Sequence, residues 1–166
     1  MAELIQLVIV TPERQLLSHP VMSVTLPGAD GELGILPGHA PLITELGIGE
    51  LSYQAEAEPV RQGAAGAAEK KYPFEDFVPH VTIIRGFAEV LPGRVTVLAE
   101  TAERAEEIDV ERAKRALERA EERIAAGPVT QDIDWDRATG SLQRAMVRLK
   151  VAEYAPRKRS VTVPGQ

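Results

Sequence analysis

The sequence predicts a β-sandwich followed by a C-terminal antiparallel two-helix hairpin. Up to about residue 100, short apolar runs with a period of two alternate with turn residues such as Gly and Pro. After Glu100 the apolar period changes to about 3.6, which is typical of helices that bury one face. Short strands at intervals of about ten residues favour a sandwich or a flattened barrel.

The composition is that of a globular chain of 166 residues, and aromatic residues make up only 4% of it. We therefore expect a core of Leu, Ile, Val and Ala. The net charge of -6 argues against nucleic acid as a partner, because phosphate backbones attract an excess of Lys and Arg. The chain has no cysteine, which excludes disulfides and thiol nucleophiles.

The first apolar run, residues 4–10, is far shorter than the roughly 20 residues that a membrane-spanning helix needs. It follows Glu3 and no basic cluster, so we expect neither a signal peptide nor direct membrane insertion.

Several runs in the first hundred residues have the length and alternation of strands in a meander. The run 21–26 ends at Pro27-Gly28, and Pro92-Gly93 forms a turn between the last two runs. The expected strands are residues 4–10, 21–26, 42–45, 49–54, 81–84, 87–91 and 95–99.

The strand pattern is interrupted between residues 56 and about 79. Residues 56–71 are rich in Ala, Glu, Gly and Lys and have no apolar period, so we expect an inserted surface excursion. A short Ala-rich helix is the alternative. The expected division of the chain is 1–100 for the sandwich, 101–155 for the hairpin and 156–166 for a basic tail.

Two helices are expected within residues 101–155. Asp109 can cap the first, which Gly127-Pro128 ends, while the second starts at Asp134 and ends before Pro156. Ala-rich faces let the two axes approach closely. The faces consist of Ala113, Ala116, Leu117, Ala120 and Ile124 in the first helix and Ala138, Leu142, Ala145, Leu149 and Ala152 in the second.

The two helices repeat each other at an offset of 25 residues. Residues 108–113 (IDVERA) recur as residues 133–138 (IDWDRA). The repeat has either a functional cause or a general one, since Asp caps, alternating charges and Ala/Leu stripes suit any helical hairpin. Further repeats are Leu117, Arg119, Ala120 and Arg123, which recur as Leu142, Arg144, Ala145 and Arg148.

Catalytic constellations are missing from the sequence. The three histidines, His19, His39 and His80, have no metal-ligand spacing, and each is expected to be an ordinary loop or strand residue. The glycines in residues 63–66 lack the spacing of a phosphate-binding loop, and no G-x-S-x-G motif occurs. We expect neither an enzyme nor a metal site.

Arginines on the expected helices are candidates for an anion site. Arg112 and Arg119 lie two helical turns apart, and Arg144 and Arg148 lie one turn apart on the partner helix. If the helices fold back on each other, the pairs converge, and guanidinium groups bind phosphate oxygens without a metal. The alternative is that they pair with carboxylates on a solvated face, such as Glu111, Glu118 and Glu122.

A segment rich in Gly and Pro connects the second and third expected strands. Residues 26–42 contain four glycines and three prolines in 17 positions, while Leu33, Ile35 and Leu36 are apolar. The segment is either a docking surface or a stretch whose apolar residues enter the core.

This segment, together with residues 46–51 (LGIGEL), resembles the signature of the epsilon subunits of bacterial and chloroplast F-type ATP synthases. Residues 86–90 (GFAEV) and 95–100 (VTVLAE) resemble that family's closing strands, and residues 108–113 its helical start. The resemblance implies a sandwich of about ten strands and a hairpin. It also implies a non-catalytic rotor subunit, peripheral at the cytoplasmic face of the bacterial inner (plasma) membrane, that couples proton flow to rotation at the gamma subunit and the c-ring.

The resemblance further implies roles for residues at matching positions. Glu32 and His39 would contact the c-ring. In an extended hairpin, Arg144, Arg148 and Lys150 would meet beta subunits of the alpha/beta catalytic head and hinder ATP hydrolysis. Some bacterial members bind ATP in the folded hairpin through an I/L-D-x-x-R-A motif, an acidic residue and later arginines. The matching residues are Glu103, Ile108, Asp109, Arg112, Ala113, Arg119, Arg144 and Arg148.

By this resemblance no cofactor is required, and ATP is a regulatory ligand. The excursion after residue 56 is longer than the family's usual turn, and the basic tail has no assigned counterpart. Two other functions remain open from the residues alone, a free-standing ATP-binding sensor and a small β-sandwich enzyme.

Overall fold

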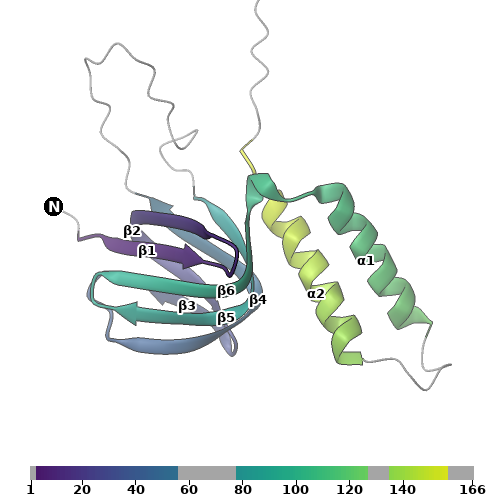
Figure 1. Cartoon of the computed structure of the whole chain (residues 1–166), viewed down its shortest axis with the longest axis horizontal. Coiled ribbons are helices and arrows are strands. Elements are labelled where there is room, and N and C mark those ends of the chain that lie inside the picture. Colours follow the sequence, from purple (N-terminus) through teal and green to yellow (C-terminus); the bar gives the residue numbers. More distant parts are fainter. Residues whose placement is uncertain (1–2, 56–77, 127–134, 157–166) are drawn as a thin grey trace, which may run out of the picture.

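The computed structural model describes residues 3–55, 78–126 and 135–156, which form a curved β domain with a pair of helices beside it (Figure 1). The expected excursion at 56–79 and the basic tail therefore lie almost wholly outside the described residues. The strands are β1 (Ile5–Val10), β2 (Gln15–Gly28), β3 (Gly31–Ile35), β4 (Leu42–Ala55), β5 (His80–Leu91) and β6 (Arg94–Arg104). The 3-10 turn η1 (Ala105–Glu107) leads to α1 (Val110–Ala125) and α2 (Trp135–Ala152).

The strands form one sheet that closes on itself. Its order is β1-β6-β5-β4-β2-β3. A further pairing of β1 with β2 closes a ring of five strands, and β3 lies outside this ring, paired with β2. The β1–β6 pair is parallel, and the other neighbours are antiparallel. The result is a two-layered, barrel-like sandwich, and the predicted fold class is confirmed.

The expectation of about ten strands was wrong, because the described residues contain six strands, of which four are long. The expected runs 42–45 and 49–54 are both parts of β4, and the runs 81–84 and 87–91 are both parts of β5. At the bend of β5, Gly86 has φ 141° and lies so close to β6 that a Cβ would stand 2.1 Å from the carbonyl oxygen of Leu98. Only glycine fits there.

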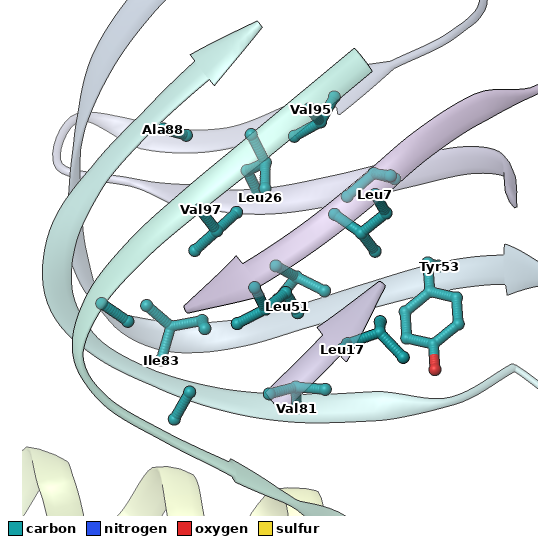
Figure 2. Close-up of a cluster of buried hydrophobic side chains, with 14 of the residues drawn as sticks. Leu7, Leu17, Leu26, Leu51, Tyr53, Val81, Ile83, Ala88, Val95 and Val97 are labelled. Carbon is teal, nitrogen blue, oxygen red and sulfur yellow. The ribbon is translucent and has the colours of Figure 1, made fainter. Parts of the chain in front are cut away.

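The core lies between the two layers of the sandwich (Figure 2). Alternate residues of each strand point inward, so that Leu7, Leu26, Leu51 and Ile83 are fully buried. Tyr53 is an aromatic member of this cluster, and the rest is aliphatic, as the composition predicts. Each large side chain buried here contributes about 1.5–3 kcal/mol of transfer free energy.

The helices run antiparallel, and α2 lies between α1 and the sandwich (Figure 1). The helix α2 packs on β4, β5 and η1, whereas α1 packs mainly on α2. The capping role of Asp109 is confirmed, since its side chain accepts a hydrogen bond from the backbone N–H of Arg112 at 2.9 Å. The expected stop at Gly127-Pro128 and the expected start at Asp134 lie outside the described residues.

The turn η1 is tied to the sandwich by two polar contacts. Arg14, between β1 and β2, pairs with Glu107 at 2.8 Å. Arg104 donates to the carbonyl oxygen of Leu16 at 2.5 Å. The chain therefore stays attached to the sandwich up to η1, and the helical pair begins only after it.

Candidate functional site

The start of α1 carries the I-D-x-x-R-A motif, and three of its residues have local structural roles. Ile108 is buried in a small cluster with Ala105 and Val151, which joins η1 to α2. Asp109 caps the helix. Ala113 is 3% exposed and faces α2. Among Ile108, Asp109, Arg112 and Ala113, the exposed Arg112 is the one whose side chain is neither buried nor held by a hydrogen bond or an ion pair within the described ranges.

The contact between α1 and α2 explains much of the 25-residue repeat. The buried residues of α1 are Ala113 and Ala120, and their equivalents Ala138 and Ala145 are buried in α2. Each helix thus presents alanines to the other at matching positions. The general cause of the repeat accounts for these alanines.

The four candidate arginines flank the contact between the helices on one side. Arg112 and Arg119 each precede a buried Ala of α1, and Arg144 precedes Ala145 of α2. A two-fold axis relates two antiparallel helices approximately, so equivalent positions fall on the same side of the pair. Arg148, one turn after Arg144, follows on that side. The folded hairpin therefore places these four arginine positions on one side of the helix pair.

Two of these arginines have side-chain partners. Arg144 donates to the hydroxyl of Ser141 at 2.9 Å. Arg148 Nε lies 2.5 Å from Glu103 Oε2, which joins α2 to β6. The expected alternative partner Glu111 instead pairs with Lys114, at 3.1 Å. The structure thus brings Glu103 and Arg148 together and leaves the guanidinium groups of Arg112 and Arg119 exposed.

Lys150 takes part in a second polar cluster at the end of α2. Its ammonium group lies 2.8 Å from Glu50 Oε2 of β4. The other carboxylate oxygen of Glu50 accepts a short hydrogen bond from Nδ1 of His80. The His80 ring stacks on Tyr154, which follows α2, with ring centres 3.6 Å apart and planes 6° apart.

The charges in this cluster stabilise one another. Burial alone would raise the pKa of the Glu50 carboxyl, but hydrogen bonds and charge from Lys150 and His80 outweigh burial and lower that pKa. The hydrogen bond to Glu50, together with its charge, raises the pKa of the Lys150 ammonium. Glu50 is therefore ionised at neutral pH and holds the end of α2.

The sequence did not indicate this cluster. His80 was expected to be an ordinary loop or strand residue, Glu50 was noted only as part of the segment 46–51, and Tyr154 was not singled out. Glu50 stands 30 residues before His80 and 100 residues before Lys150, so no local spacing could connect them. The pairing of β4 with β5 and the packing of α2 on these strands bring them together.

The segment 26–42 divides its residues between the core and the surface. Ile35 is buried in the core and Leu33 packs against it, whereas Leu36 is 63% exposed. The predicted contact residues also lie at the surface: Glu32 is exposed on β3, and half-buried His39 has Nδ1 2.7 Å from the carbonyl oxygen of Ala40. The alternative that apolar residues of this segment enter the core is therefore correct for Ile35 and Leu33, whereas the docking surface stays a prediction.

A second apolar surface lies on the outer face of the sandwich, away from α2. Ile43, Phe87 and Leu98 come from the neighbouring strands β4, β5 and β6, and each is more than half exposed. Phe87 and Leu98 are direct partners in the ladder between β5 and β6. Exposed apolar residues on adjacent strands are a common mark of a protein contact surface.

Comparisons with known proteins match both parts of the chain. Residues 4–69 match the model of the ATP synthase delta/epsilon chain beta-sandwich domain. Residues 106–153 match the model of the ATP synthase delta/epsilon chain long alpha-helix domain.

Whole-chain relatives are also found. The ATP synthase epsilon chain of Syntrophobacter fumaroxidans is 47% identical over 154 residues, which cover 92% of this chain and 98% of the relative. That of Geobacter sulfurreducens is 42% identical over 159 residues, covering 95% and 100% respectively.

Among solved structures, a chain of the Euglena gracilis mitochondrial ATP synthase (OSCP/F1/c-ring, rotational state 1) superposes with a TM-score of 0.68 at 24% identity. The match covers 91% of this chain and 82% of that one. A chain from the central stalk and c-ring of the Tetrahymena thermophila mitochondrial ATP synthase gives a TM-score of 0.52 at 12% identity. That match covers 91% of this chain and 95% of the other, and both matches support the fold.

Proposed function

We propose that this chain couples proton flow to ATP synthesis and restrains ATP hydrolysis. The chain belongs to the family of ATP synthase epsilon chains, and the proposal proceeds from that membership. As an epsilon chain it is a non-catalytic subunit of ATP synthase. Its proposed place is the central stalk, peripheral at the cytoplasmic face of the bacterial inner (plasma) membrane. Within the described ranges, neither helix is long and apolar enough to cross a membrane.

In this proposal the sandwich is the fixed part of the rotor. Glu32 and His39, beside exposed Leu36, contact the polar loops of the c-ring. The outer apolar surface formed by Ile43, Phe87 and Leu98 suits the gamma subunit, because burying such a surface stabilises a complex that must transmit rotation.

The hairpin is the regulatory part. In the folded position, Arg148 pairs with Glu103 and Lys150 pairs with Glu50. These basic side chains can meet acidic segments of the alpha/beta catalytic head only after α2 leaves the sandwich. This mutual exclusion carries the proposal, because folding of the hairpin then permits hydrolysis and extension hinders it.

The test is ATP hydrolysis by the assembled ATP synthase with and without the hairpin. A chain that ends at Glu107 keeps β1 to β6 and η1 but lacks α1 and α2. We expect hydrolysis to rise severalfold, while proton-driven ATP synthesis is kept. Equal hydrolysis by the two complexes would contradict the inhibitory role. The control for coupling is a complex that lacks the whole chain, sandwich included, which should lose ATP synthesis.

ATP is the proposed regulatory ligand of the folded hairpin. Four arginines on one side of the helix pair favour a polyphosphate, and Asp109 and Glu103 offer carboxylates at the same end of α1. Arg148 would have to exchange its contact with Glu103 for a phosphate, or bind both. Calorimetric titration of the chain with ATP tests this, and we expect the Arg112→Ala and Arg144→Ala variants to bind more weakly.

The same arginines favour the second candidate function, a free-standing ATP sensor. The two functions differ in their partners, because a sensor would need no gamma surface. Purification of the chain within a rotor complex would exclude the sensor. Binding of ATP without any association with gamma would support it.

A further inference from the structure

The face of the sandwich beneath α2 carries a row of three polar residues. Glu50 of β4 is the ladder partner of Thr82 of β5, and Thr82 is the partner of Glu103 of β6. Neighbours across a ladder point to the same face of a sheet. The middle member, Thr82, is 0% exposed, and its hydroxyl oxygen has no hydrogen-bond partner among the described residues.

The helix α2 carries two basic residues that match the ends of this row. Arg148 and Lys150 are two positions apart, which is about 200° of helical rotation, so they flank the face that carries buried Val151. Arg148 reaches Glu103 on one side, and Lys150 reaches Glu50 on the other. The helix therefore straddles the row, with an apolar residue between two ion pairs.

Glu50 has more partners than Glu103. Its side chain is only 13% exposed and contacts both Lys150 and His80. His80, in turn, stacks on Tyr154, so it holds the chain just after α2 as well. Two elements of the sandwich, β4 and β5, thus hold the last turn of α2 through one carboxylate and one imidazole ring.

We propose that Glu50 and His80 form a latch in the sandwich that sets how often the hairpin leaves it. In this proposal the buried hydroxyl of Thr82 opposes docking. The latch rests on the proposed inhibitory function of the hairpin. The Glu50–Lys150 ion pair and the stack of His80 on Tyr154 exist only when α2 is docked, so removing Glu50 or His80 removes stabilisation of the docked state. The unpaired hydroxyl of Thr82 has the opposite effect, because docking buries it away from water without a partner.

The test is a distance distribution between the sandwich and α2 in the full-length chain. The chain has no native cysteine, so labels attach only at two introduced cysteines, Arg94→Cys and Gln143→Cys, both at exposed positions. Pulsed electron spin resonance between nitroxide labels resolves docked and undocked populations. We expect Glu50→Gln and His80→Ala each to raise the undocked fraction about tenfold.

Two further variants define the expected pattern. Glu45→Gln makes the same change of charge on the same strand, at an exposed position that forms no ion pair with α2 among the described residues, and should leave the distribution unchanged. Thr82→Val removes the unpaired hydroxyl while keeping the shape, and should lower the undocked fraction about fivefold. An unchanged thermal unfolding of the sandwich in Glu50→Gln would show that the variant acts on docking and not on folding.

Latch and inhibition can fail separately. If Glu50→Gln and His80→Ala give the distribution of Glu45→Gln, the latch is wrong, whatever the assembled enzyme does. If they release the hairpin, the latch is confirmed, and ATP hydrolysis by the assembled enzyme should fall. Hydrolysis that stays unchanged despite a released hairpin would overturn the inhibitory function while leaving the latch in place.

Discussion

The sandwich and the hairpin are stabilised in different ways. The sandwich buries a continuous cluster of large aliphatic side chains, including Leu7, Leu26 and Ile83. The two helices meet through alanines, and α2 meets the sandwich through ion pairs, a ring stack and a small cluster around Val151. An Ala buries far less apolar area than a Leu. The sandwich thus holds itself together, whereas the hairpin depends on the sandwich.

The need for packing supports the same contrast. In proteins most of the stability of a helix comes from packing of its amphipathic face, and this holds for α1 and α2, which have 16 and 18 residues. Because α1 packs mainly on α2, it should unfold when α2 leaves the sandwich, unless another surface binds the two helices. Weak attachment is what a part that changes partners requires.

The largest effect should follow a change inside the sandwich, at the bend of β5. In Gly86→Ala, the new Cβ would overlap the backbone of β6, and alanine disfavours the φ of 141°. We expect a loss of about 4 kcal/mol in the free energy of unfolding, measured by urea denaturation. Gly34→Ala is the control, because a Cβ there meets nothing within 4 Å. Equal stability of the two variants would disprove the tight approach of β5 to β6.

A smaller effect, confined to the hairpin, should follow overpacking between the helices. Ala120 is 1% exposed and faces α2. Ala120→Leu should push the helices apart at a cost of about 1–3 kcal/mol, and circular dichroism should show early loss of helix while the sandwich unfolds as before. Ala125→Leu, at an exposed position of α1, should have little effect. A simultaneous loss of both parts would argue against their independence.

A third effect concerns only the start of α1. Asp109→Ala removes the capping hydrogen bond to the N–H of Arg112, and loss of a cap costs about 1 kcal/mol. Hydrogen exchange should speed up in the first turn of α1 and stay unchanged in α2 and the sandwich. Glu118→Ala, an exposed change in the middle of α1, should not have this effect.

The smallest effect is a pH dependence of docking. The pKa of Glu50 is lowered in the docked state, so its contribution is present above the usual carboxyl pKa and is lost as the pH falls through the lowered value. The undocked fractions of the parent chain and Glu50→Gln should therefore differ at neutral pH and approach each other in acid. A difference that persists in acid would contradict the role of the Glu50 charge.

Local patterns in the sequence predicted the fold class, the two helices and the cap at Asp109. The number of about ten strands, which the resemblance implied, was wrong. Strand β5 was expected as two strands because a kink such as that at Gly86 looks like a turn in the sequence, although hydrogen bonding continues on both sides of it. The I-D-x-x-R-A motif was recognisable because its residues are adjacent. The cluster of Glu50, His80 and Lys150 was not, since it depends on the pairing of β4 with β5 and on the docking of α2.

The central claim is that the hairpin opens from a sandwich that stays folded. Native-state hydrogen exchange of the full-length chain tests it most directly, because it measures the free energy of opening at each backbone amide. We expect amides of α1 and α2 to exchange through a shared opening of lower free energy than the one that exposes β4, β5 and β6. If the helices and these strands exchange through a single opening with the full free energy of unfolding, the hairpin does not leave the sandwich on its own, and the account is wrong.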